Sequence, residues 1–142
     1  LEDMYEKTRR DGFGDEVKRR ILIGNYVLSS GYYDAYYKKA QSVRRLLRQA
    51  VESAHESYDY ILSPTAPGPA FPLGERTDDP LSMYLTDICT TYANLTEVPA
   101  VSIPAGSTDE GLPVGVQIAG PRLSDERLLS ITETIHSAGA TT

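Results

Sequence analysis

This chain of 142 residues lacks several features that mark particular classes of protein. It has a single cysteine, Cys89, so no internal disulfide can form, and we expect a reducing, cytoplasmic environment. It has no apolar run near the ~18 residues of a membrane-spanning helix, and no signal-peptide pattern at its start. We therefore expect a cytoplasmic protein that does not span a membrane.

The chain also lacks an excess of positive charge. Its formal net charge is −6, which disfavours direct binding to the phosphates of a nucleic acid. Basic side chains do gather on one expected helix, over residues 34–54: Lys38, Lys39, Arg44, Arg45 and Arg48. A solvated helical face accounts for them, and a contact with a partner protein or an RNA is the alternative.

Recognisable catalytic motifs are missing as well. Neither His55 nor His136 is expected to bind a metal, and no phosphate-binding loop of the form GxxxxGK[ST] occurs. We expect Cys89 to act as a small buried hydrophobic residue and not as a nucleophile. The residues of this chain, taken alone, predict no catalytic group and no metal site.

The sequence pattern predicts a domain of mixed helix and strand. A glycine-containing turn at residues 11–14 separates a polar helical segment from the helices that follow. The remaining expected elements are helices over 15–28, 34–54 and 81–89, strands over 60–62, 101–103 and 114–118, and a last helix that begins at Ser124. Three strands are fewer than the ~5–6 of an average sheet, so we expect them to belong to a larger one.

One arginine falls in an apolar position. Around the helix over 15–28, Arg20 lies within the arc that contains Val27, Gly24 and Ile23, whereas Arg19 lies outside it. A buried guanidinium needs an anionic or hydrogen-bonding partner. A structural ion pair or a snorkelling side chain is one interpretation, and a fork that binds a ligand carboxylate is the other.

Asp87 raises the same question with the opposite charge. On the helix expected over 81–89 it lies between Met83 and Tyr84, beside the apolar face. An ion pair or a cap for the next segment would explain it, and so would a carboxylate that receives a ligand ammonium group. A free α-amino acid needs one receptor for its anion and one for its cation.

Three stretches together resemble a known family. They are Tyr60-Ile-Leu-Ser-Pro-Thr-Ala-Pro67, Pro99-Ala-Val-Ser-Ile-Pro-Ala-Gly106 and Gly111-Leu-Pro-Val-Gly-Val-Gln-Ile118. With Phe13–Gly24, Leu28–Gln41 and Asp78–Tyr84 they are similar to the C-terminal part of amidase-signature enzymes, most of all to the branch that serves tRNA amidation. The similarity covers nearly all of residues 1–136. Because the chain begins with Leu1 and not with methionine, we expect it to be a fragment of a longer chain.

This resemblance implies an α/β fold, the C-terminal portion of an α/β/α sandwich around a mixed sheet. Residues 1–142 are then one piece of a single amidase domain, whose Ser–cis-Ser–Lys catalytic residues all lie upstream, so the fragment alone is expected to be inactive. The intact protein is expected to hydrolyse glutamine and pass ammonia to a partner subunit. The partner, with the help of a small third subunit, uses ATP and magnesium to amidate a glutamyl-tRNA, so tRNA is an indirect partner.

The resemblance also assigns the two charged residues. In the family, the second arginine of the Lys-Arg-Arg run receives the α-carboxylate of glutamine, and that position falls on Arg20. The aspartate after the Met-Tyr helix receives the α-amino group, and that position falls on Asp87. The chain departs from the family at Tyr92, where a proline is usual, and at Glu97, where a glycine is usual.

Two alternatives remain open at this stage. A stand-alone amidase for small amides shares the same sequence patterns, and the departures at Tyr92 and Glu97 bear on its choice of substrate. A non-catalytic adaptor domain that docks through the helix over 34–54 is the other.

Overall fold

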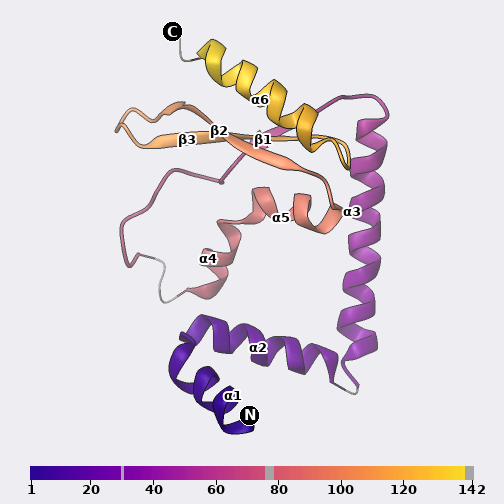
Figure 1. Cartoon of the computed structure of the whole chain (residues 1–142), viewed down its shortest axis with the longest axis vertical. Coiled ribbons are helices and arrows are strands. Elements are labelled where there is room, and N and C mark those ends of the chain that lie inside the picture. Colours follow the sequence, from indigo (N-terminus) through magenta and orange to yellow (C-terminus); the bar gives the residue numbers. More distant parts are fainter. Residues whose placement is uncertain (30, 76–78, 140–142) are drawn as a thin grey trace. The chain divides into compact units, whose positions relative to one another are not determined.

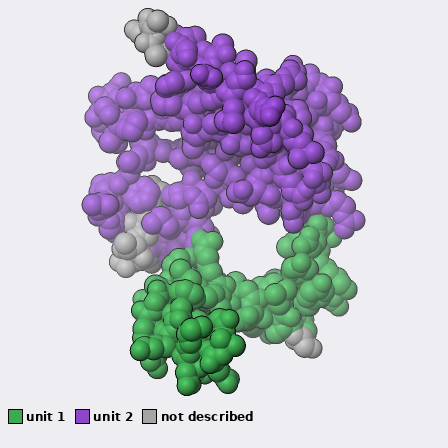
Figure 2. Space-filling model, in the orientation of Figure 1, with its two compact units in different colours: residues 1–43 green, residues 44–142 purple. Residues whose placement is uncertain are grey.

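The computed structural model describes residues 1–29, 31–75 and 79–139. The chain divides into two compact units, residues 1–43 and 44–142, drawn in green and purple in Figure 2. No helix within the described residues is long and apolar enough to cross a membrane. Each unit is described by itself below.

The first unit is helical. Its elements are α1 (Glu2–Lys7), a π-helical segment η1 (Thr8–Gly12), α2 (Asp15–Leu28) and a second π-helical segment η2 (Tyr33–Lys38). The expected helix over 15–28 is confirmed, with Asp15 and Glu16 at its positive end. The turn expected over 11–14 is shorter than predicted, because helical structure continues to Gly12 and only Phe13 and Gly14 are extended.

Tyrosine rings pack against one another between α2 and the segment that leads into η2, and also within η2. The ring centroids of Tyr26 and Tyr32 are 4.2 Å apart, and those of Tyr33 and Tyr37 are 4.8 Å apart. The pKa of Tyr26 lies above its ordinary value, chiefly because of a hydrogen bond with the Tyr32 hydroxyl. Partial burial and the neighbouring Tyr36 act in the same direction.

This hydrogen bond leads to a testable pKa shift. In Tyr32→Phe the leading cause of the raised pKa is gone, so we expect the pKa of Tyr26 to fall toward its ordinary value. NMR titration of the ring carbon next to the Tyr26 hydroxyl measures the change. The matched variant Tyr33→Phe, which alters the other ring pair, should leave that titration where it is. An unchanged pKa in Tyr32→Phe would contradict this assignment.

The second unit is built on a three-stranded sheet, labelled in Figure 1. Its strands β1 (Ile61–Pro64), β2 (Ala100–Ser107) and β3 (Pro113–Ala119) lie in the order β1-β3-β2, and both pairings are antiparallel. The three expected strands are confirmed in place, and the mixture of helix and sheet confirms the α/β class. Gly111, with φ of +82°, supports the turn that joins β2 to β3.

Helices pack against both faces of this sheet. Alternate residues of a strand point to opposite faces, and β3 separates its neighbours Ile118 and Ala119 in this way. Ile118 packs with Leu128 of α6 (Asp125–Gly139), whereas Ala119 packs with Ala93 of α5 (Ile88–Thr96). In Figure 1, α6 accordingly lies above the sheet and α5 below it. The core of this unit is therefore split between the two faces.

Two longer helices were predicted well in position. The helix expected over 34–54 is observed as η2 followed by α3 (Lys39–His55). The last helix begins directly after Ser124, as expected. The Ser124 hydroxyl, however, donates to the Pro121 carbonyl at 2.7 Å, and so it stabilises the preceding turn.

Candidate functional site

Asp87 lies at a break between two helices. We expected one helix over 81–89, but the structure has α4 (Pro80–Leu85) and α5 (Ile88–Thr96). Pro80 occupies the first turn of α4, where a proline is well accommodated, and the Asp79 side chain caps that helix by accepting from the Leu81 N–H. The single-helix prediction was wrong because Asp87, with φ of −95° and ψ of 2°, leaves the helical conformation.

The backbone of Asp87 is held firmly while its side chain is not used as a cap. Its carbonyl accepts from the Thr90 N–H at 3.0 Å, from the Thr91 N–H at 3.1 Å and from the Thr91 hydroxyl at 2.8 Å. The Asp87 carboxylate makes no side-chain cap bond to α5, and the residue is exposed. The capping role considered for it is therefore not the one observed, and the carboxylate is carried on a fixed turn.

Two cavities flank the loop that follows β1 and contains Pro67, Pro69 and Pro72. The larger, of about 1000 Å³, extends between the loop and the sheet, where the Thr65 and Ser102 hydroxyls lie 2.6 Å apart. The smaller, of about 390 Å³, is lined by Ala66–Phe71 together with Ser82 and Thr86 of the α4 region. Because Thr86 precedes Asp87, the smaller cavity lies next to the turn that carries this carboxylate.

Arg20 is not in the buried environment that its helical position predicted. Its side chain is 64% exposed, and its Nε donates to Oε1 of Glu16 at 2.8 Å, one helical turn away. Arg19 pairs with the other oxygen of the same carboxylate, also at 2.8 Å. The prediction of burial was wrong because the apolar arc of α2 is itself exposed: Ile23 is 50% exposed.

The structure places Arg20 in the first unit and Asp87 in the second. Their convergence on one ligand therefore stays a prediction, and so do their roles. Both side chains are exposed on the part of the chain that the structure describes, so both can meet a ligand or another polypeptide segment.

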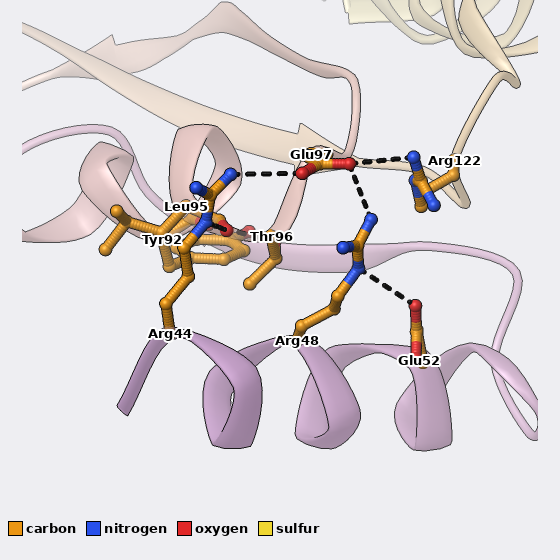
Figure 3. Close-up of polar contacts among 8 residues, drawn as sticks. All are labelled: Arg44, Arg48, Glu52, Tyr92, Leu95, Thr96, Glu97 and Arg122. Atoms are coloured by element: carbon orange, nitrogen blue, oxygen red, sulfur yellow. Dashed lines mark hydrogen bonds and ion pairs between the residues drawn. The ribbon is translucent and has the colours of Figure 1, made fainter. Parts of the chain in front are cut away.

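Glu97 is the centre of a cluster of charges, shown in Figure 3. Its two carboxylate oxygens accept from three guanidinium groups: Arg44 at 3.0 Å, Arg122 at 2.7 Å, and Arg48. Arg48 also pairs with Glu52 at 3.3 Å. Basic residues from α3 and from the loop before α6 thus meet at the end of α5, so two of the five basic side chains of the helix over 34–54 have internal partners here.

The backbone at Glu97 explains why a glycine suits this position. Glu97 ends α5 with φ of 63° and ψ of 35°, the left-handed conformation that glycine adopts without steric cost. The Arg44 Nε also donates to the Leu95 carbonyl at 2.8 Å, which satisfies one of the last carbonyls of α5. Glutamate at this position therefore adopts a turn that favours glycine and supplies a carboxylate for the arginines.

Gln117 is a site residue that the sequence analysis missed. It lies in β3, the central strand of the sheet, and is only 4% exposed. Its side-chain amide donates to the Cys89 carbonyl at 3.0 Å and to the Ser63 hydroxyl at 3.2 Å. Val114, Val116 and Ile118 alternate along β3, a pattern typical of one buried face, but alternation gives no sign that the other face is covered too. A glutamine between apolar residues was the available signal.

Comparison with known proteins places this geometry in a family. The family model described as Amidase matches residues 1–129, so the chain belongs to the amidase family. Curated relatives include the GatA subunit of glutamyl-tRNA(Gln) amidotransferase from Desulfotalea psychrophila, 56% identical over 92% of the chain. The same subunit from Acidobacterium capsulatum is 57% identical over 96% of it. The chain spans 27% and 29% of those two proteins.

Solved structures agree with this assignment. The GatA subunit of glutamyl-tRNA(Gln) amidotransferase from Thermotoga maritima superposes with a TM-score of 0.65 at 48% identity, over 87% of this chain and 27% of that one. A crystal structure described as an amidase gives 0.66 at 26% identity, over 88% and 29%. The resemblance seen in the sequence, to amidase-signature enzymes and within them to GatA, is confirmed.

Proposed function

We propose that this chain is the C-terminal part of the glutamine-hydrolysing subunit of a glutamyl-tRNA(Gln) amidotransferase. The observation that carries the proposal is the level of identity. The chain is 53–57% identical to proteins named as the GatA subunit of this enzyme, but 26% identical to the solved amidase. A stand-alone amidase of small amides is therefore the weaker candidate.

In this proposal the intact protein hydrolyses glutamine in the cytoplasm and delivers ammonia to a partner subunit. The partner uses ATP and magnesium to convert Glu-tRNA(Gln) to Gln-tRNA(Gln), and a small third subunit completes the complex. The nucleophilic serine, the bridging serine and the lysine belong to the part of the amidase domain that this chain does not contain. Within the described residues, no group of three or more histidine, cysteine or acidic side chains could hold a metal.

The contribution of this chain is then substrate binding and scaffold. The planar guanidinium of Arg20 offers two parallel N–H donors to the α-carboxylate of glutamine, a geometry that a lysine cannot reproduce. The Asp87 carboxylate accepts from the α-ammonium group. Its exposed position on a turn whose backbone is hydrogen-bonded supports this role, because a receptor fixed in advance loses little entropy on binding.

The division of labour has a direct test. The 142-residue chain, assayed alone, should release no ammonia or glutamate from glutamine above a heat-treated control, because the proposal puts the nucleophile elsewhere. The complete subunit carrying the same sequence should hydrolyse glutamine under the same conditions. Measurable turnover by the isolated chain would refute the assignment of the chemistry to the rest of the domain.

A further inference from the structure

Gln117 links the sheet to the start of α5. On β3 it lies in register with Ser63 of β1 and Ser102 of β2, at the middle of the sheet. A buried amide must find hydrogen-bond partners, and it finds them in the Cys89 carbonyl, the Ser63 hydroxyl and, at 3.4 Å, the Tyr92 hydroxyl. Cys89 and Tyr92 both belong to α5. The Gln117 side chain therefore connects β3 with β1 and with α5 through hydrogen bonds.

The bond to Cys89 acts on the turn that carries Asp87. Cys89 lies in the first turn of α5, two residues after Asp87. The two residues that follow Cys89 are Thr90 and Thr91, and both donate hydrogen bonds to the Asp87 carbonyl. The Asp87 turn and the first turn of α5 thus form one hydrogen-bonded segment. The amide of Gln117 joins this hydrogen-bonded segment to the central strand β3.

We propose that Gln117 is a positioning residue for Asp87: through the Cys89 carbonyl it fixes the turn from which the Asp87 carboxylate reaches the ammonium group of the substrate. This inference rests on the proposed function for the role of Asp87, but its mechanical part does not. Gln117 touches no substrate in this account, and its effect passes entirely through the first turn of α5.

The mechanical part is tested with Gln117→Leu, which removes the amide donors and keeps a similar volume. The control is Thr132→Val in α6, since Thr132 is also buried (7% exposed) and its hydroxyl also donates to a carbonyl. In the complete subunit, hydrogen exchange at the Thr90 and Thr91 amides should be about 2- to 13-fold faster in Gln117→Leu, the range set by one lost hydrogen bond. The control should leave these two amides unchanged. Equal exchange in both variants would overturn the inference.

The functional part is tested by kinetics with glutamine. We expect Gln117→Leu to raise KM about 2- to 13-fold while kcat changes less than about twofold, because a misplaced receptor weakens binding more than chemistry. Thr132→Val should leave both constants unchanged. In the double variant with Asp87→Asn, the two increases in KM should not multiply, because both substitutions remove the same contact.

The outcomes separate the two proposals. If Asp87→Asn leaves KM for glutamine unchanged, the proposed role of Asp87 fails, whatever the exchange data show. If Asp87→Asn raises KM, but the increase in the double variant equals the product of the two single increases, the proposed function survives and the positioning role is overturned.

Discussion

In the complete subunit, Arg20→Lys should lower kcat/KM for glutamine about 10- to 150-fold, the equivalent of about 1.5–3 kcal/mol for a lost charge-assisted hydrogen bond. Lysine keeps the positive charge but loses the planar two-donor fork. Amidation of Glu-tRNA(Gln) with ammonia as the nitrogen donor should continue at its normal rate, because ammonia bypasses the glutamine site. Parallel assays with the two nitrogen donors measure the difference.

Arg19→Lys is the matched control for this variant. Arg19 neighbours Arg20 and pairs with the same Glu16 carboxylate, so both variants alter the same kind of surface ion pair. Arg19→Lys should leave both activities unchanged. If Arg20→Lys instead reduced the two activities equally, together with the melting temperature, Arg20 would be a structural residue and its proposed contact with substrate would be wrong.

Glu97→Gln should destabilise the protein by about 1–2 kcal/mol, the sum expected for three partly exposed ion pairs. The substitution keeps the shape of the side chain and its left-handed backbone, but it leaves Arg44, Arg48 and Arg122 without their shared carboxylate. Urea unfolding measures the loss. The difference in the free energy of unfolding between this variant and the unsubstituted protein should decrease in about 1 M salt, where the screening length falls to about 3 Å.

Glu97→Gly should cost less than Glu97→Gln. Glycine removes the same three ion pairs, but it also removes the cost of about 1–2 kcal/mol that a side chain incurs in the left-handed region. Asp59→Asn is a control, because the Asp59–Arg127 pair is more exposed, and it should change stability by less than about 0.5 kcal/mol. A Glu97→Gly variant less stable than Glu97→Gln would contradict the account of this turn.

Local signals in the sequence predicted much of the fold. Three elements that the structure confirms carry such signals: acidic residues at the start of α2, a proline in the first turn of α4 and alternation along β3. These signals succeed because capping, proline geometry and strand periodicity act within a few residues. The break at Asp87 was missed because a short apolar run continues on both sides of it, and neither glycine nor proline marks the interruption.

The candidate site was harder to predict because its residues depend on tertiary contacts. The helical arc of α2 grouped Arg20 with apolar residues, but the arc could not reveal that these residues are themselves exposed. Glu97 meets Arg44 and Arg122 across 53 and 25 positions of sequence, so no local pattern connects them. Gln117 likewise reaches Cys89 across 28 positions.

We propose that the complete protein serves glutamine-dependent amidation of a tRNA. The most direct measurement is the formation of Gln-tRNA(Gln) by the complete subunit together with its ATP-dependent partner. The reaction contains Glu-tRNA(Gln), ATP and magnesium, and either glutamine or ammonia as the nitrogen donor. The account predicts Gln-tRNA(Gln) from either donor, and loss of the glutamine-driven reaction alone in Arg20→Lys and Asp87→Asn. A complete subunit that hydrolyses other small amides but yields no Gln-tRNA(Gln) from glutamine would contradict it.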